Sequence, residues 1–178
     1  MVNTCENSPW HREDNVGVHT QMLIDHYKKN YANIRSEKQN ILSLVACLMH
    51  DIGKPPAEVT KTSEARGEYR SYAGHEQLSA RLWVDYALSN IELIKDLLKF
   101  NITDIANIAM MLEYHVPFGI KHPRKLSNMC DSIKNRMGDE GHRAWIDFIM
   151  CDQNGRISDD QETKLAAVHE WFKKWETL

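Results

Sequence analysis

The sequence predicts an all-α protein, a compact bundle of several helices. Apolar residues recur at helical spacing in many segments, and Ile108, Met111 and Leu112 are one example. Residues 41–49 are apolar except for Ser43, so a helix there has no single apolar stripe and must be covered on all sides. Apart from the polar residues 1–15, residues 54–74 are the one long stretch without helical spacing. These observations together predict a central helix surrounded by others.

The expected helices follow one another with short breaks. A polar arm over 1–15 precedes the first helix, Pro117 ends the helix before the basic loop 119–125, and Gly138 separates two later helices. The expected helical ranges are 16–31, 37–51, 75–89, 91–100, 104–115, 126–137, 140–152 and 161–175. The central helix, 37–51, ends in His50 and Asp51, where Gly53 and the following Lys-Pro-Pro are stop signals.

Residues 54–74 are the least helical part of the chain. They begin with two prolines and contain two glycines, and the run 59–62 lies opposite the run 69–72, with threonine in the first and tyrosine in the second. A loop or a short β-hairpin fits this pattern. The stretch therefore interrupts an otherwise helical protein directly after the central helix.

Composition limits the classes of function. The 178 residues suit one domain over 1–178, and a net charge of −3 provides no general basic field for holding duplex nucleic acid, although a local basic patch can still guide a phosphate. The four cysteines form no CxxC pair, which indicates reduced thiols in a cytoplasmic protein. No signal peptide or membrane span is expected. Five Trp and eight Met suit a dimer face or a core equally well, so the oligomeric state stays open.

Six metal-capable residues occupy inward positions of five predicted helices. His115 continues the stripe of Ile108, Met111 and Leu112, and Asp152 continues that of Trp145 and its neighbours. A single inward histidine is more often a hydrogen-bonded core residue than a ligand, so the prediction of a metal site rests on the six residues taken together. Four imidazoles and two carboxylates suit Mn²⁺, Fe, Co²⁺, Ni²⁺ or Zn²⁺, with Mg²⁺ held through carboxylates and water. The six are His19, His50, Asp51, His75, His115 and Asp152.

The strings around these residues resemble a known family. VGVHT (16–20), HDIGK (50–54), GHE (74–76), EYH (113–115) and CDQNGR (151–156) are similar to the motifs of the HD-domain metal-dependent phosphohydrolases. PWHREDNVGVHT (9–20), HDIGKP and SYAGHE further resemble the HD domain of bacterial CCA-adding tRNA nucleotidyltransferases and of HD-polynucleotide kinase fusions. The resemblance covers about 9–156, without a nucleotidyltransferase or kinase portion, and so implies a free-standing HD-domain bundle.

The resemblance also implies how the six residues act. His19, His50, Asp51 and Asp152 would hold one divalent ion, and Asp51 would bridge to a second held by His75 and His115. Many HD enzymes of similar pattern work with one ion. Water activated by the metal would attack phosphorus, which agrees with the lack of a serine or cysteine nucleophile motif and of a glycine-rich phosphate loop.

Several residues around the metals are candidates for catalysis or for binding the substrate. Asp51 is catalytic through the metal, Lys54 would meet a phosphate oxygen, pair with a ligand carboxylate or cap its own helix, and Arg156 would clamp phosphate or lie on the surface. The basic loop with Lys121, His122, Arg124 and Lys125 forms an electropositive rim or is only solvated. Trp10 and His11 would stack on a base of the substrate, or Trp10 would instead pack the N-terminal arm against the core.

The first functional hypothesis is hydrolysis of phosphomonoesters or 2′,3′-cyclic phosphates of nucleotides or RNA ends. The alternative enzyme is a 5′-nucleotidase or a dNTP/NTP phosphohydrolase that acts on free nucleotides. The alternative from another class of function is a metal- or nucleotide-binding module without turnover. The presence of all six ligand residues argues against this alternative. Activity on a mononucleotide but not on an oligonucleotide would separate the enzymes.

Overall fold

The computed structural model describes residues 15–64, 67–116 and 123–157, together with residues 4, 162, 165, 166, 168, 170, 172 and 173. The prediction of an all-α fold with a short hairpin is confirmed. The elements in chain order are α1 (Val16–Asn30), α2 (Glu37–Met49), α3 (Lys54–Ala57), β1 (Val59–Ser63), β2 (Gly67–Ser71), α4 (His75–Ser89), α5 (Ile91–Leu98), α6 (Ile102–Glu113) and α7 (Pro123–Asn154).

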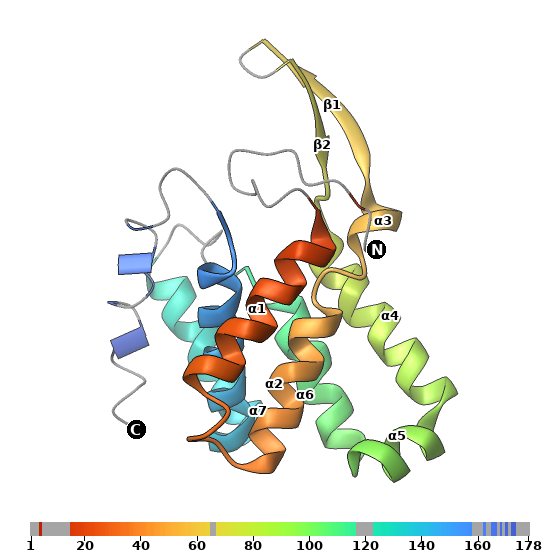
Figure 1. Cartoon of the computed structure of the whole chain (residues 1–178), viewed down its shortest axis with the longest axis vertical. Coiled ribbons are helices and arrows are strands. Elements are labelled where there is room, and N and C mark those ends of the chain that lie inside the picture. The colour runs from red at the N-terminus through yellow and green to blue at the C-terminus, as the bar shows by residue number, and fades with distance from the viewer. Residues whose placement is uncertain are drawn as a thin grey trace.

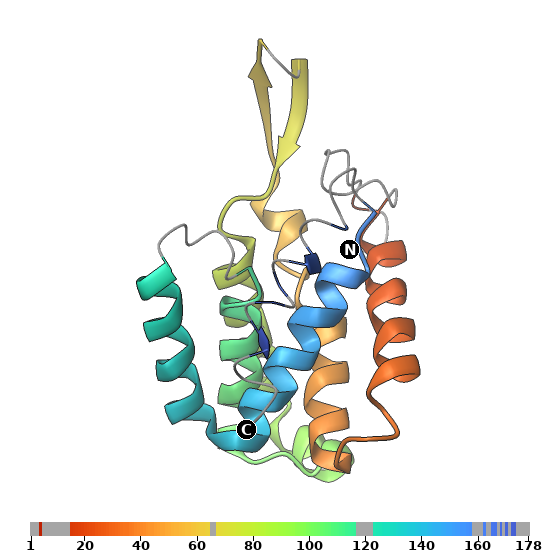
Figure 2. The same ribbon diagram turned by 90° about the vertical axis from the view of Figure 1, so that its left-hand side faces the viewer.

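The long helices alternate in direction, so that helix ends meet at one end of the bundle. In Figure 1, α1 and α4 begin at the end from which the hairpin projects, while α2 and α6 end there. Figure 2 shows that the second half of α7 also ends there, beside the start of α1. The short α5 joins α4 to α6 at the opposite end. The hairpin end therefore collects residues from five helices.

Local sequence determines where several helices begin. The Asn15 side chain accepts a hydrogen bond from the Val18 backbone N at 3.1 Å, which caps α1. Ser36 and Gln39 form a capping box at α2, and Asn101 and Asp104 form another at α6. These side chains satisfy backbone N–H groups that a helix leaves open at its start.

The central helix α2 is buried on most sides but not on all. Leu42, Ala46 and Cys47 are in the core, whereas Leu48 is 47% exposed. Since α2 packs against α1, α6 and α7, the remaining side of the helix faces solvent. The prediction of complete coverage is therefore wrong at Leu48.

The inward face of α4 also differs from the prediction, which placed Leu78, Leu82 and Tyr86 inside. Tyr86 is 49% exposed, and the buried residues are instead Ser79, Ala80, Trp83 and Ala87. Trp83 donates from its indole Nε1 to the Ile105 carbonyl at 3.0 Å, which fixes its ring against α6. The three small residues let α4 approach its neighbours closely, a benefit that a search for large apolar residues overlooks.

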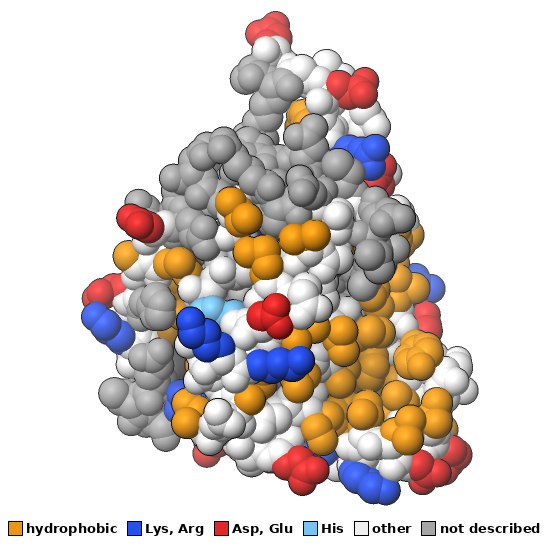
Figure 3. Space-filling model, in the orientation of Figure 1, with side chains coloured by type: hydrophobic (Ala, Val, Ile, Leu, Met, Phe, Trp, Pro, Cys, Tyr) orange, Lys and Arg blue, Asp and Glu red, His pale blue; other side chains and the backbone are white. Residues whose placement is uncertain are grey.

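Hydrophobic side chains remain exposed where α4 and α5 lie. Figure 3 shows them gathered over that part of the surface. Leu88 is 52% exposed on α4, and Leu93 and Leu97 are 50% and 71% exposed on α5. None of the helices in the described ranges is long and apolar enough to cross a membrane.

The helix α7 contains the predicted break. Gly138 has a φ of 68°, where glycine is favoured, and divides one 32-residue element into two helices, as expected. Trp145, Phe148 and Ile149 are fully buried, which confirms the predicted inward face. The last predicted helix, 161–175, lies largely outside the described residues, but Phe172 is buried with its ring 6.1 Å from that of Trp145.

The segment after α2 contains a helix and the hairpin. Strands β1 and β2 are antiparallel, with Val59 opposite Ser71 and Lys61 opposite Tyr69. Residues 54–57 form the short helix α3, although the prolines were predicted only to stop α2. Proline is tolerated in the first turn of a helix, where its missing N–H has no partner to lose. The stop signal for α2 is therefore also the start of α3.

Cys47, Cys130 and Cys151 are buried. Burial raises the pKa of the Cys47 and Cys151 thiols, so both stay protonated and act as small apolar groups. Cys5 lies outside the described residues.

Candidate metal centre

The six metal-capable residues come together at the hairpin end of the bundle in two groups. Within each group, one ligand atom per residue lies within 4.8 Å of the others. Group one is His19, His50 and Asp152, and group two is Asp51, His75 and His115. All are buried except His75, whose side chain is 12% exposed. The residues selected from apolar stripes and from the end of the central helix therefore converge in space.

Alternating helix directions explain this convergence. His19 is the fourth residue of α1, and His75 is the first residue of α4. His50 caps the end of α2, and Asp152 is two residues before the end of α7. Two of the ligands lie near the start of their helices and the others near the end. They meet at the hairpin end of the bundle because these helices are antiparallel.

Group one is built around Asp152. Its Oδ1 lies 3.0 Å from His19 Nε2 and 3.9 Å from His50 Nε2. The two imidazole rings have their centroids 5.2 Å apart, edge to face. One carboxylate oxygen and two ring nitrogens therefore face a common point.

Group two is built around Asp51, which also touches group one. Its Oδ1 lies 3.3 Å from His75 Nε2 and 3.9 Å from His115 Nε2, and these two nitrogens are 3.3 Å apart. Its Oδ2 lies 3.0 Å from His50 Nε2. Asp51 thus stands between the groups, with one oxygen toward each.

The tautomers of all four histidines follow from backbone contacts. A carbonyl oxygen only accepts hydrogen bonds, so each Nδ1 must carry the proton that it donates, and each Nε2 is left facing the centre as the atom that can bind a metal. The pairs are His19 with Gly155 O (3.0 Å), His50 with Cys47 O (2.9 Å), His75 with Tyr72 O (2.9 Å) and His115 with Leu112 O (2.6 Å). Metal-ligating histidines are held in the same way.

Unsatisfied atoms at the centre fit a cation. Within the described residues, His50 Nε2 and Asp51 Oδ1 are buried and accept no hydrogen bond. Leaving a buried polar atom unpaired costs about 1–3 kcal/mol. The lone pairs of His75 and His115, 3.3 Å apart, also repel each other unless a positive charge lies between them. A divalent ion removes these costs, so the residues present fit one.

The electrostatics of the centre favour a neutral His115 beside two ionised carboxylates. Burial, and then His50 and His75, lower the pKa of His115 to about 3, so this imidazole is neutral over the ordinary pH range. Burial alone would raise the pKa of Asp51, but His50 and Lys54 outweigh it and hold the value well below the usual range. Burial opposes ionisation of Asp152 too, and Arg156 and His19 keep its pKa well below the usual range. Both carboxylates are therefore charged and ready to bind a cation.

Lys54 and Arg156 each pair with one of these carboxylates. Lys54 is only 4% exposed, and its Nζ lies 2.7 Å from Asp51 Oδ2. Arg156 donates from Nη2 to Asp152 Oδ2, which also accepts from Gln153 Nε2 at 3.0 Å. Of the alternatives for Lys54, the structure favours pairing with a carboxylate over capping of a helix. The alternative that Arg156 lies on the surface is wrong, because its side chain is only 18% exposed and forms an ion pair with Asp152.

Two glycines position the centre, and the sequence argument missed this role. A Cβ on Gly53 would lie 2.3 Å from the His75 carbonyl oxygen, and the Gly53 N–H donates to Ser79 Oγ at 2.9 Å. A Cβ on Gly155 would lie 2.5 Å from Leu23 Cδ1. Both glycines occur in the quoted strings HDIGK and CDQNGR, where they could have been noted. Ser79 lies outside the quoted strings, and no feature of the sequence pointed to its contact with Gly53.

The remaining candidate residues that the structure describes belong to neither group. Arg124 and Lys125 are exposed in the first turn of α7, and no hydrogen bond or ion pair among the described residues joins Arg124 to the centre. His142 is buried in α7 with its ring 5.7 Å from Trp145, and it belongs to neither group. Trp10, His11, Lys121 and His122 lie outside the described residues.

Comparison with known proteins supports one family. The sequence pattern of the HD domain matches residues 15–115, which contain five of the six residues, while Asp152 lies beyond the match. Searches of curated proteins and of solved structures gave no significant match. Because the match spans more than half of the 178 residues, the chain belongs to the HD domain family.

Proposed function

We propose that the protein is a divalent-metal-dependent phosphohydrolase that cleaves phosphomonoesters or 2′,3′-cyclic phosphates of nucleotides or RNA ends. The family consists in general of metal-dependent hydrolases. One observation carries the proposal: the Nε2 atoms of four histidines, three of them buried, converge on two ionised carboxylates, with every Nδ1 held by a backbone carbonyl.

The two groups suggest which residues would hold metal. Group one would hold one ion, and group two a second, with Asp51 shared between them. The donor set favours Mn²⁺, Fe, Co²⁺, Ni²⁺ or Zn²⁺ over Ca²⁺, with Mg²⁺ accepted through the carboxylates and water. A bound ion supplies positive charge that polarises a phosphoryl oxygen and lowers the pKa of water toward neutrality.

The protein's own side chains orient the substrate. Lys54 Nζ and Arg156 Nη2 lie next to the two ligand carboxylates. Ammonium and guanidinium groups donate to phosphate as they do to carboxylate, so we assign both to phosphate oxygens. The ring of Phe148, whose centroid is 5.9 Å from that of His50 and 6.2 Å from that of His115, keeps water from one side of the centre.

Access to the centre is expected beside the hairpin. His75 is the most exposed of the six ligand candidates, and it follows β2 by a short turn. The substrate class is supported by the similarity of PWHREDNVGVHT and SYAGHE to HD domains of RNA-end enzymes. In this proposal Trp10, His11, Lys121 and Arg124 are the residues assigned to binding a base or a neighbouring phosphate of the substrate.

Phosphate release by metal-stripped protein tests the function. Mn²⁺, Co²⁺, Ni²⁺, Mg²⁺ and Zn²⁺ are resupplied separately, with 2′,3′-cyclic mononucleotides, 2′-, 3′- and 5′-monophosphates, dNTPs and RNA ending in a cyclic phosphate as substrates. The proposal expects metal-dependent turnover of 2′ or 3′ phosphates and cyclic ends. Turnover confined to 5′-phosphates or triphosphates would indicate an enzyme of free nucleotides, and inactivity on every substrate would indicate a binding module.

A matched pair of variants assigns the activity to the centre. Asp51→Asn removes a carboxylate that pairs with Lys54 at the centre. Asp104→Asn removes a carboxylate that pairs with Lys38 and belongs to neither metal-capable group. Both substitutions neutralise a buried carboxylate that pairs with a lysine. Only Asp51→Asn is expected to abolish turnover per folded molecule, with folding checked by circular dichroism. Equal turnover in the two variants would reject the assignment.

A further inference from the structure

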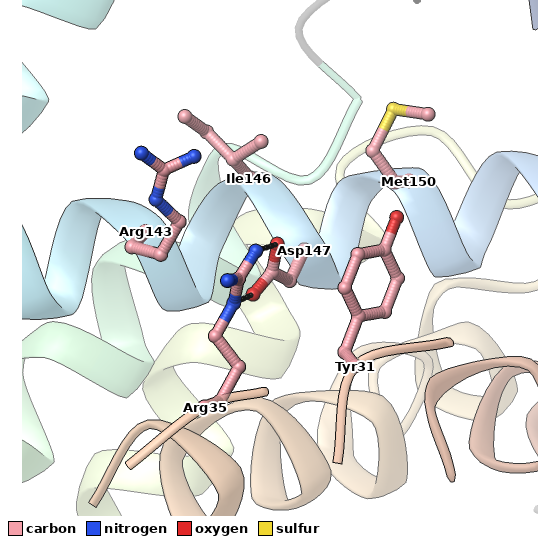
Figure 4. A pocket seen from close by; sticks show the side chains of 6 residues that line it. All are labelled: Tyr31, Arg35, Arg143, Ile146, Asp147 and Met150. Carbon is pink, nitrogen blue, oxygen red and sulfur yellow. Dashed lines mark hydrogen bonds and ion pairs between the residues drawn. The ribbon is translucent and has the colours of Figure 1, made fainter. Parts of the chain in front are cut away.

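A second concave site lies against α7, away from the metal centre. It is a pocket of about 290 Å³ that opens between α7 and the segment joining α1 to α2 (Figure 4), here named the α7 pocket. Its lining residues are Tyr31, Arg35, Arg143, Ile146, Asp147 and Met150. None of them belongs to either metal-capable group.

The helical spacing of α7 explains why the pocket is separate. The four α7 residues of the lining recur at i, i+3, i+4 and i+7 and so share one face. Trp145, Phe148 and Asp152 lie on a different face of the same helix, which turns toward the core and group one. One helix therefore serves two sites.

The charges of the α7 pocket leave one guanidinium available. Arg35 donates two hydrogen bonds to Asp147, at 2.5 and 2.9 Å, and these two charges offset each other. Arg143 is partly exposed, and within the described ranges no carboxylate lies at ion-pair distance from it. The lining thus carries a net charge of about +1, centred on a group that binds carboxylate or phosphate through two parallel hydrogen bonds.

The rest of the lining is apolar and aromatic. Ile146 and Met150 are each 2% exposed, and the Arg35 guanidinium carbon lies 5.7 Å from the centre of the Tyr31 ring. Figure 4 shows Tyr31 and Arg35 reaching toward α7 from the opposite wall. A tyrosine ring, a methionine side chain and a fixed guanidinium plane together form a surface on which a flat ring can stack.

We propose that the α7 pocket binds a small organic anion that carries a flat ring, of the kind that a nucleoside monophosphate represents. Arg143 binds the anionic group, while Tyr31 and Met150 contact the ring. Pockets for small ligands begin at about 300 Å³, so the volume suits a ligand of this size rather than a larger one. The proposal stands apart from the hydrolytic function, since it uses none of the same residues.

Calorimetric titration with 5′-AMP tests the proposal. The protein is kept metal-free with EDTA, so that neither hydrolysis nor binding through an ion contributes. The variants are Arg143→Gln and, as a matched control, Arg136→Gln, which removes an exposed arginine elsewhere on α7. Loss of the charged hydrogen bonds is expected to weaken AMP binding at least about tenfold in Arg143→Gln, with Arg136→Gln like the wild type.

Two further titrations separate the parts of the ligand. Adenosine and inorganic phosphate are each expected to bind at least about tenfold more weakly than AMP, because each lacks one half of the recognised chemistry. Equal binding of AMP by wild type and Arg143→Gln would overturn the proposal. Absence of binding up to about 10 mM AMP, or inorganic phosphate binding as tightly as AMP, would overturn it too.

Discussion

At the scale of single residues, the centre is held mostly by short-range contacts. Three of its histidines donate Nδ1–H to the carbonyl three residues earlier in the chain: His50 to Cys47, His75 to Tyr72, and His115 to Leu112. These orientations therefore depend on local backbone. His19 is the exception, because it donates to Gly155 O at the far end of the chain. Group one accordingly needs α1 and α7 to be docked, whereas the histidines of group two are oriented locally.

Gly53→Ala is expected to destabilise the protein and to weaken metal binding. The new Cβ would meet the His75 carbonyl oxygen at 2.3 Å, so the end of α2 must move away from α4 and carry Asp51 from His75. Overpacking of this kind costs about 1–3 kcal/mol. Urea unfolding and Mn²⁺ titration measure the two effects. Gly67→Ala in the hairpin is the comparison, because its φ of 64° makes alanine strained there while no atom lies within 4 Å of the added Cβ, so stability is lost far from the centre. Wild-type metal affinity in Gly53→Ala would contradict this role for Gly53.

Lys54→Met separates substrate binding from metal binding. Lys54 lies 2.7 Å from Asp51, where a cation opposes the entry of a metal ion, so its removal is expected to leave metal affinity unchanged or higher. The KM for a phosphorylated substrate should rise about 10- to 100-fold, since a charged hydrogen bond to phosphate is lost. Steady-state kinetics and metal titration provide the two readings. Weaker metal binding with an unchanged KM would show that Lys54 serves only to hold Asp51 in place.

At the scale of secondary structure, periodicity predicted the helices well and their buried faces less well. Trp145, Phe148 and Ile149 were expected inside α7 and are buried there. On α4 the buried face consists of Trp83 and small residues, because close approach to α6 matters more than the size of the apolar side chain. The α3 helix was missed because proline was taken only as a terminator. These differences arise from packing between elements, which a single-segment pattern does not contain.

The buried histidine of α7 makes stability depend on pH. Burial first, and then Lys134 and Arg143, lower the pKa of His142 to about 4, and Asp139 and Asp131 oppose the shift. Between about pH 6.5 and pH 4 the unfolded chain takes up a proton at this position that the folded chain does not. Stability should therefore fall as the pH drops through this window. His142→Asn should show a shallower decline in urea unfolding than His26→Asn, a variant of a partly exposed histidine on α1. Equal slopes in both variants would reject this contribution.

At the scale of the whole molecule, the candidate centre could be predicted and its surroundings could not. Four of the six ligand candidates were selected from apolar stripes, and His50 and Asp51 from the end of the central helix; the antiparallel helices bring all six together. The burial of Lys54 and the pairing of Arg156 with Asp152 depend on helix ends that meet only in the folded chain. The α7 pocket depends on Arg35 and Asp147, which are 112 positions apart and show no shared local pattern.

Metal binding should stabilise the whole fold. The ligands come from five helices, so an ion that binds the folded state draws them together. At an ion concentration 100 times the Kd, the gain is about 2.7 kcal/mol, which corresponds to a rise in Tm of roughly 5–10 °C for a chain of this size. Differential scanning fluorimetry with Mn²⁺ after EDTA treatment measures it. Asp51→Asn should lose most of the rise, and an equal rise in this variant would place the binding elsewhere.

The most direct test of the account is to locate bound metal by anomalous X-ray scattering from crystals grown with Mn²⁺. The account predicts a peak coordinated by His19, His50 and Asp152 and a second coordinated by His75 and His115, with Asp51 between them. Each peak should be contacted through histidine Nε2 atoms, because the Nδ1 atoms are occupied by backbone carbonyls. No peak at these residues under saturating Mn²⁺, or a peak only on exposed carboxylates, would contradict the central claim.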